Sequence, residues 1–274
     1  MTLLVVGASG YLGGEICRQA VAAGSRVVGT YLRAPGTVAG VTWVPLDVRD
    51  GAAVRAVVAR SRPGAVVNTA YAYGDWAVTA TGAASVALAA VAVGARLVHL
   101  SSDAVHAGRA ASYVDDEPPA PVFAYGAAKA AAETAVAALD PGAAIVRTSL
   151  IVGDARSGQE ALCRAAIDGR AALFEDEIRC PVAVADLAAA VLELVGPIGF
   201  GGLLNVAGPE AVSRVELGRL VAARYGLDGS RIRAGSVAAA GLVRPERVVL
   251  DVSRAGALLR TRLRPVSEVY PPRA

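Results

Sequence analysis

The chain has 274 residues, of which 54% are hydrophobic and 19% are charged, and its formal net charge is +3. This composition is typical of one large domain, or of a domain with a smaller lobe, and it excludes a largely disordered chain. The basic residues are scattered and the net charge is small, so we expect no nucleic-acid partner.

Cysteine content and hydropathy point to a cytoplasmic protein. Cys17, Cys163 and Cys180 show no metal or redox spacing, so we expect reduced thiols and no metal site. The first residues run directly into an apolar strand, and we expect no secretory signal. Residues 77–95 carry no charge and are long enough to span a membrane, but they are mostly alanine, which contributes little to insertion. We therefore expect a buried helix there and no membrane partner.

Apolar, strand-like runs alternate with alanine-rich helical runs over the first 150 residues. Strands are expected at residues 3–6, 26–31, 41–46, 65–70, 96–101 and 143–148. Helices are expected at residues 12–23, 51–61, 77–95 and 123–139. The alternation predicts an α/β fold of the Rossmann type, with a doubly wound parallel sheet covered by helices on both sides.

After residue 150 the alternation becomes less regular. Helices near residues 186–195 and 214–225 flank a short strand at residues 203–206. We expect an NAD(P)-binding Rossmann domain over residues 1–150. Residues 151–274 are then a smaller C-terminal substrate-binding lobe that partly returns to the sheet.

A glycine-rich turn joins the first expected strand to the first expected helix. Gly7, Gly10 and Gly13 have the spacing that allows a tight turn and lets backbone amides approach a pyrophosphate. The alternative is a glycine-rich turn that binds nothing. From this turn we expect the cofactor to be bound by Gly7, Ser9, Gly10, Tyr11, Leu12 and Gly13.

The ends of the next strands indicate which cofactor is bound. No acidic residue follows the second strand, where NAD enzymes commonly bind the ribose 2′-hydroxyl. Thr30 and Arg33 stand there instead and suit a 2′-phosphate, unless Arg33 is only a solvated loop residue. We therefore expect NADPH rather than NADH. Further cofactor contacts are expected at Asp47, which could equally cap a turn, and at Val48, Asn68, Thr69 and Ala70.

The only lysine of the chain, Lys129, follows Tyr125 by four residues in the fourth expected helix. Residues at this spacing share a helix face. An ammonium beside a phenol favours the phenolate and lowers the pKa of the phenol, which makes Tyr125 a usable acid near neutral pH. A compact ammonium also reaches a ribose hydroxyl in a way that an arginine fork does not. The alternative is an ordinary surface pair.

Ser102 and Asp103 follow the fifth expected strand, at the edge of the sheet where ligands of such folds bind. A serine hydroxyl there can bind a substrate carbonyl, or it can simply cap the strand end. His99 is expected in the interior of the strand. His106 lies in the following loop, and we include it among the substrate-contact candidates.

Further motifs occur in a familiar order along the chain, and each is quoted as it stands: Arg147-Thr-Ser-Leu-Ile-Val-Gly153, Cys180-Pro-Val-Ala-Val-Ala-Asp186-Leu, Leu204-Asn-Val-Ala-Gly208 and Arg244-Pro-Glu-Arg-Val-Val-Leu-Asp251. With the glycine turn and the Tyr125–Lys129 pair, they resemble the extended short-chain dehydrogenase/reductases, and within them the dTDP-4-dehydrorhamnose reductase family. The resemblance implies a catalytic triad of Ser102, Tyr125 and Lys129.

The chain departs from this family around the expected substrate site. Ala104, His106 and Ala107 alter the segment after Ser102, and residues 71–76 also differ from the usual pattern. We expect substrate contacts at Tyr71, Tyr73, Trp76, Asp103, His106 and Arg179. If the substrate carries a diphosphate, Arg147, Arg156 and Arg179 are the candidates for its phosphates.

The resemblance implies an NADPH-dependent carbonyl reductase that acts on a 4-keto nucleotide sugar or a related natural-product intermediate. In this reaction Tyr125 protonates the ketone oxygen and Ser102 orients it. Two alternatives remain open, namely a non-catalytic NADP-binding regulatory subunit and a nucleotide-sugar epimerase. The expected assembly is a homodimer.

Overall fold

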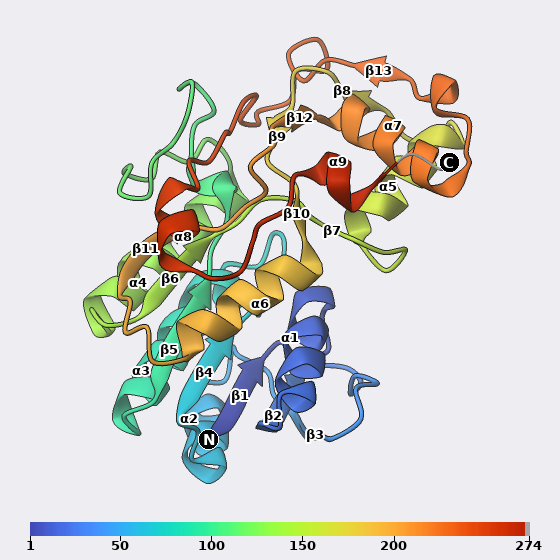
Figure 1. Cartoon of the computed structure of the whole chain (residues 1–274). Coiled ribbons are helices and arrows are strands. Elements are labelled where there is room, and N and C mark those ends of the chain that lie inside the picture. The colour runs from blue at the N-terminus through green and yellow to red at the C-terminus, as the bar shows by residue number, and fades with distance from the viewer. Residues whose placement is uncertain (272–274) are drawn as a thin grey trace.

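A seven-stranded parallel sheet forms the centre of the protein in the computed structural model, which describes residues 1–271 (Figure 1). The strand order is β11-β6-β5-β4-β1-β2-β3, so the order reverses between β1 and β4, as in dinucleotide-binding sheets. This arrangement confirms the predicted Rossmann-type fold. The strands are β1 (Thr2–Val6), β2 (Arg26–Tyr31), β3 (Val41–Pro45), β4 (Ala65–Asn68), β5 (Arg96–Leu100), β6 (Ala144–Arg147) and β11 (Gly202–Asn205).

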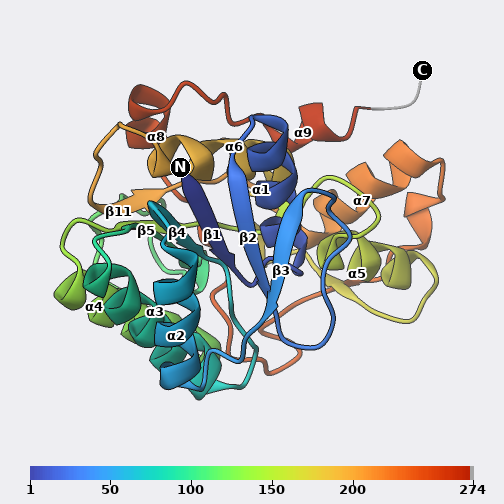
Figure 2. The ribbon, with the colours of Figure 1, turned by 90° about the horizontal axis from the view of Figure 1, so that it is seen from below.

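Helices cover both faces of the sheet, as Figure 2 shows from below. One layer contains α1 (Tyr11–Ala22), α6 (Val184–Val195) and α8 (Ser253–Leu258), and the other contains α2 (Gly51–Ser61), α3 (Gly82–Ala92) and α4 (Ala124–Leu139). Successive β1 side chains alternate between the layers: Leu3 and Val5 pack with α1 and α6, whereas Leu4 and Val6 pack with α2 and α3. Burial on both faces explains why the strands are continuous apolar runs.

The uncharged segment at residues 77–95 lies inside the protein, as predicted, but it is not one regular helix. A π-helical turn, η1 (Ala77–Thr81), precedes α3, and the chain leaves the helix before Gly94, which has a positive φ of 66°. Thr79 is buried in the π-helical turn and bonds both the amide and the carbonyl of Ala72. Within residues 1–271, no helix has the length and apolarity needed to cross a membrane.

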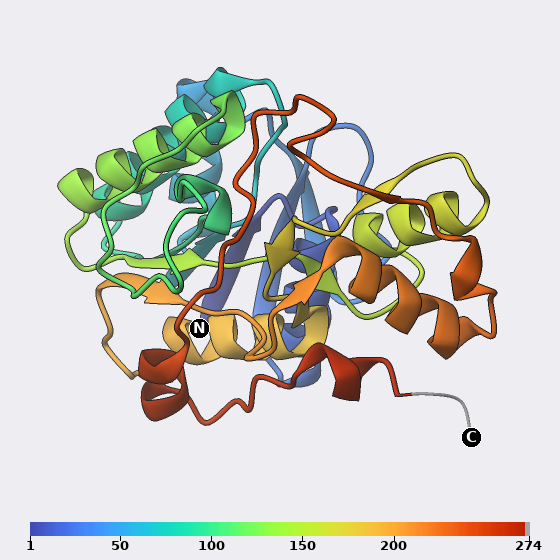
Figure 3. The same cartoon turned by 90° about the horizontal axis from the view of Figure 1, so that it is seen from above.

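Residues after 150 contribute to two regions. β11 is an edge strand of the central sheet, α6 and α8 pack on that sheet, and a smaller lobe lies beside its carboxyl edge (Figure 3). The lobe has its own apolar core around α5 (Gly158–Ile167) and α7 (Arg214–Tyr225), to which α9 (Val266–Val269) also contributes. Its other elements are β7 (Ile151–Val152), β8 (Leu173–Phe174), β9 (Ile178–Arg179), β10 (Val182–Ala183), β12 (Val212–Ser213), η3 (Gly229–Arg231) and β13 (Ala234–Gly235).

The segment between β13 and α8 crosses from the small lobe back over the carboxyl edge of the sheet (Figure 3). Arg179 of β9 anchors this segment, because its guanidinium donates hydrogen bonds to the carbonyls of Pro245 (2.6 Å) and Glu246 (3.1 Å). The crossing segment therefore faces the ends of the sheet strands across a cleft.

Candidate active site

The cleft has a volume of about 530 Å³. Its walls come from the carboxyl ends of β1, β4, β5 and β6, from the start of α4 and from the small lobe. Ligands of open parallel sheets bind at this edge. Residues that line the cleft include Gly7, Gly10, Tyr11, Leu12, Gly13, Thr69, Tyr71, Tyr73, Ser102, Asp103, Tyr125, Lys129, Gln159, Glu177, Arg179, Arg214 and Arg244.

The glycine-rich turn has the geometry that a dinucleotide site requires. Gly7 has a positive φ of 81°, and a Cβ at Gly13 would lie 2.8 Å from the Cα of Ala8, so neither position accepts a side chain. α1 begins after Gly10, which has no side chain to cap the helix, and its first turn holds no acidic residue. The amides at the N-terminus of α1 therefore remain available for an anion in the cleft.

Tyr125 and Lys129 lie one turn apart near the start of α4, as predicted. Lys129 is 2% exposed, and its Nζ donates a hydrogen bond of 2.8 Å to the carbonyl of Leu100 at the end of β5. Its Nζ also lies 5.4 Å from the centroid of the Tyr71 ring. Burial lowers the pKa of Lys129 to about 8. The ammonium has three donors, and those not used by Leu100 are available to a ligand in the cleft.

The predicted effect of Lys129 on the phenol is wrong for this structure. The pKa of Tyr125 is raised above its ordinary value, first by burial and then by the neighbouring Tyr73 and Tyr71. The neighbouring Ser102 hydroxyl acts in the opposite direction and lowers it. The Lys129 ammonium instead donates to the backbone, so Tyr125 holds its proton firmly here.

Ser102 and Asp103 form a polar pair after β5. The Ser102 hydroxyl caps the short helical turn η2 (Asp103–Val105) by accepting from the Ala104 amide, and it lies 3.2 Å from Oδ1 of Asp103. Ser149 donates a 2.6 Å hydrogen bond to Oδ2 of Asp103, and Nε of Arg179 lies 3.6 Å from the same oxygen. Burial raises the pKa of Asp103, and Arg179 and Ser149 oppose this shift. Ser102 thus caps the turn that follows β5 and also lines the cleft.

Several expected cofactor residues do not line the cleft itself: Ser9, Thr30, Arg33, Asp47, Val48, Asn68 and Ala70. Thr30 is buried and accepts a 3.1 Å hydrogen bond from the Gly7 amide, so it supports the glycine turn. Asp47 accepts hydrogen bonds from both the side chain and the amide of Arg49, as a turn-capping carboxylate does. Nδ2 of Asn68 lies 3.2 Å from Nδ1 of His99, and His99 is buried inside β5 as predicted. Contacts between these residues and the cofactor stay predictions.

The expected substrate residues fall into two groups. Tyr71, Tyr73, Asp103 and Arg179 line the cleft. Trp76 and His106 do not, because Trp76 is exposed outside the cleft, whereas His106 is fully buried and stacks on Tyr113 with ring centroids 4.2 Å apart. The sequence placed His106 in a loop and gave no sign that its ring stacks on Tyr113.

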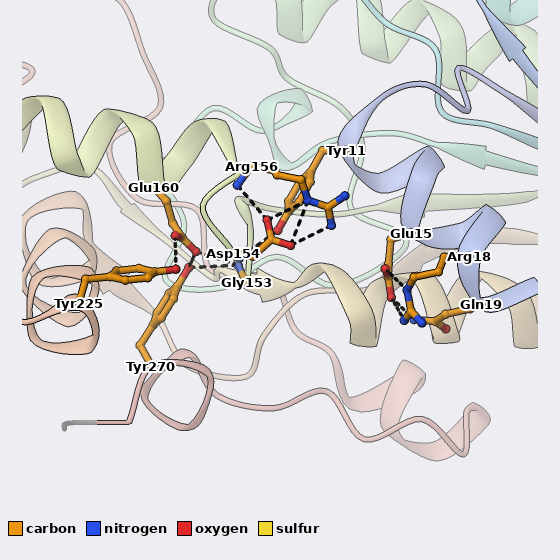
Figure 4. Close-up of polar contacts among 10 residues, drawn as sticks. All are labelled: Tyr11, Glu15, Arg18, Gln19, Gly153, Asp154, Arg156, Glu160, Tyr225 and Tyr270. Carbon is orange, nitrogen blue, oxygen red and sulfur yellow. Dashed lines mark hydrogen bonds and ion pairs between the residues drawn. The ribbon is translucent and has the colours of Figure 1, made fainter. Parts of the chain in front are cut away.

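The three arginines expected to bind phosphate are all engaged within the protein. Arg147 is fully buried and makes a 2.8 Å ion pair with Glu133, so it is not available to a ligand in the cleft. Arg156 is exposed and pairs with Asp154, whose amide donates to the hydroxyl of Tyr11 (Figure 4). Arg179 is occupied by backbone carbonyls.

The small lobe contributes cleft residues that the sequence did not single out: Gln159, Glu177, Arg214 and Arg244. Arg244 begins one of the quoted motifs, and Ser213 with Glu216 forms a capping box that places Arg214 at the start of α7. This motif and this capping box are the local sequence features that could have drawn attention to Arg244 and Arg214. The same lobe is held together by Glu160, which accepts hydrogen bonds from Tyr225 (2.8 Å) and Tyr270 (Figure 4).

Comparisons with known proteins agree with this geometry. A family model described as "RmlD substrate binding domain" matches residues 1–269. A dTDP-4-dehydrorhamnose reductase of Mycobacterium tuberculosis is 33% identical over 250 residues, which cover 84% of this chain and 78% of that protein. A probable dTDP-4,6-dihydroxy-2-methyloxan-3-one 4-ketoreductase of Streptomyces antibioticus is 32% identical over 249 residues, with coverage of 85% and 80%.

A solved structure shows the same fold. The dTDP-4-dehydrorhamnose reductase of Bacillus anthracis, in complex with NADP, superposes with a TM-score of 0.81 at 22% identity and covers 98% of this chain and 96% of that one. The predicted resemblance is therefore confirmed. The chain belongs to the RmlD substrate binding domain family, and the relatives that it matches include dTDP-4-dehydrorhamnose reductases.

Proposed function

We propose that the protein is an NADPH-dependent reductase that converts a keto group of a nucleotide-linked sugar, or of a related natural-product intermediate, into an alcohol. One observation carries the proposal: Ser102, Tyr125 and Lys129 line the same cleft as the glycine-rich turn. The names of the two curated relatives, a reductase and a ketoreductase of dTDP-linked compounds, support the same reaction class.

The residues fit a nicotinamide cofactor. A Cβ on Gly7 would lie 2.9 Å from the Ala70 amide, so glycine lets the turn pack directly against the end of β4, and Gly7, Gly10 and Gly13 line the cleft where a pyrophosphate would lie. Lys129 is buried beside the cleft with donors to spare, which suits the hydroxyls of a ribose. When bound, NADPH supplies the hydride that reduces the ketone.

The residues of the chain supply the proton and the orientation. Tyr125 is protonated at neutral pH, as an ordinary phenol is, and burial raises its pKa further. It passes its proton to the ketone oxygen as negative charge develops there. Ser102, held beside Asp103, hydrogen-bonds the same oxygen.

The finer assignments belong to the same proposal. Residues 1–150 hold the cofactor, and residues 151–274 hold the substrate over the sheet. The protein acts in the cytoplasm as a homodimer on a freely diffusing small molecule. Sedimentation of the purified protein tests the assembly, and a monomer at micromolar concentration would remove that part of the proposal.

The test of the reaction is to mix the protein with NADPH and a dTDP-linked 4-keto sugar and to follow both NADPH and product. We expect one alcohol formed for each NADPH consumed. A change of configuration without net consumption of NADPH indicates the epimerase alternative. Tight binding of NADPH with no turnover of any keto sugar indicates the regulatory subunit, and either result overturns the proposal.

A further inference from the structure

A buried carboxylate lies at the end of the cleft formed by the small lobe. The Glu177 side chain is 8% exposed and stands just before β9. Three guanidinium groups surround it: Arg179 at 3.6 Å, Arg214 at 3.7 Å and Arg244 at 3.7 Å. All three distances exceed the length of a charge-assisted hydrogen bond. Within the described part of the chain, the buried Oε2 atom of Glu177 has no hydrogen-bond partner.

Two of the surrounding arginines donate hydrogen bonds to other groups and do not donate one to Glu177. Arg179 donates to the backbone carbonyls of Ile178, Pro245 and Glu246. Arg214 donates a 2.7 Å hydrogen bond to the side chain of Gln159. A buried carboxylate without hydrogen bonds is costly, and such groups are rare unless a ligand or solvent satisfies them. Glu177 also lines the cleft, so a ligand there can supply the hydrogen bond that this carboxylate lacks.

Glu177 is linked to the reaction centre through one guanidinium. Arg179 lies 3.6 Å from Glu177 and, through Nε, 3.6 Å from Asp103, the neighbour of Ser102. The carboxylate and the proton donor thus line the same cleft, and a substrate with its carbonyl at Ser102 and Tyr125 shares that cleft with Glu177.

The charges around Glu177 restrict what it accepts. An ammonium group would approach three guanidinium groups, and a phosphate would approach the carboxylate itself. A neutral hydroxyl avoids both repulsions and donates the hydrogen bond that Oε2 lacks. Arg214 approaches Glu177 through Nε and Arg244 approaches it through Nη1. Arg214 also uses Nη1 for Gln159, and the Arg244 side chain is 49% exposed, so each guanidinium keeps a further donor for a phosphate that does not contact the carboxylate.

We propose that Glu177 is a specificity-determining residue that accepts a hydrogen bond from a hydroxyl group of the substrate sugar, while Arg214 and Arg244 bind the diphosphate linked to it. This inference rests on the proposed function and deepens it. The substrate class is a nucleotide-linked keto sugar that retains a free hydroxyl. A site built to bind a hydroxyl rejects analogues that lack it.

Calorimetric titration with dTDP and with dTDP-glucose tests the assignment, since dTDP-glucose adds a hydroxylated sugar to the same nucleotide. We expect the wild type to bind dTDP-glucose more tightly than dTDP. In Glu177→Leu this advantage should fall about tenfold, the scale of one hydrogen bond to a charged group, while dTDP binds at least as tightly as before. Glu177→Gln keeps one acceptor and should lose less.

Glu175→Gln is the matched control, because Glu175 is exposed on the same segment and its substitution removes the same charge. It should leave both affinities unchanged, and thermal melting checks that each variant is folded. Equal changes for both ligands in Glu177→Leu would show that Glu177 acts only through its charge, and weaker dTDP binding would place the contact on the nucleotide. Either result, or a wild type that binds the two ligands equally, overturns the inference.

The two proposals fail separately. If the wild type consumes NADPH with a keto sugar but shows no dependence on Glu177, the reductase function stands and this inference is wrong. If Glu177 distinguishes dTDP-glucose from dTDP but no keto sugar is reduced, the binding site stands and the proposed reaction is wrong.

Discussion

Tyr73 stacks on Tyr125, with ring centroids 4.2 Å apart and ring planes inclined by 25°. Tyr73 is largely exposed on its other side, so it covers the proton donor at the mouth of the cleft. Tyr71 adds a second ring, 6.0 Å from Tyr125. These rings exclude water from the phenol and contribute to the rise in the pKa of Tyr125.

Removing the covering ring should shift the pH dependence of the reaction. Tyr73→Ala exposes the phenol to water, and the pKa of Tyr125 should fall toward its ordinary value. The protonated phenol is the active form, so the alkaline limb of the kcat profile should move to lower pH. Trp76→Ala is the matched control, because Trp76 is an exposed aromatic residue of the same loop outside the cleft. An identical profile for Tyr73→Ala and wild type would contradict this role.

Lys129 should make stability depend on alkaline pH. Burial lowers its pKa from 10.5 to about 8, so between these values the unfolded chain binds a proton that the folded chain has released. The free energy of unfolding therefore rises with pH across this window, by up to about 3 kcal/mol. Lys129→Met removes the group. Denaturant unfolding of both proteins between pH 7.5 and about 10 measures the difference, and parallel curves would argue against a depressed pKa.

Arg147 should be essential to the fold rather than to ligand binding. Its guanidinium bonds Glu133 and the carbonyls of Asp115 and Glu117 at zero exposure. Arg147→Met leaves the buried Glu133 carboxylate without its guanidinium partner, with a hydrogen bond from Ser101 remaining, and this should lower the free energy of unfolding by about 3–5 kcal/mol. Arg156→Met, at an exposed pair, should cost about 0–1 kcal/mol. Comparable losses in the two variants would refute the distinction.

Cofactor preference should depend on the end of β2. Arg33 is exposed where a 2′-phosphate is expected, and no acidic residue competes with it there. Arg33→Ser should weaken NADPH binding about tenfold or more, the scale of a charge-assisted hydrogen bond, and leave NADH binding unchanged. Arg26→Ser, at the opposite end of the same strand, is the control. Equal or tighter binding of NADH by the wild type would contradict the preference.

Local sequence patterns predicted the features that depend on close neighbours in the chain. The glycine turn and the Tyr125–Lys129 pair are short-range patterns, and the structure places both in the cleft. The central sheet followed from apolar runs that are buried on both faces. Assignments failed where partners are distant in sequence: His106 stacks on Tyr113, and Arg147 pairs with Glu133. Glu177 gave no local signal, because its surroundings come from three separate segments.

The central claim is that Tyr125 donates the proton during ketone reduction, and single-turnover reduction of a dTDP-linked 4-keto sugar by Tyr125→Phe tests it most directly. Tyr225→Phe, which removes a phenol outside the cleft, is the matched control. We predict that hydride transfer slows by about 10²-fold or more in Tyr125→Phe, the scale of losing a positioned acid, while NADPH affinity changes little. Near wild-type hydride transfer in Tyr125→Phe would contradict the account.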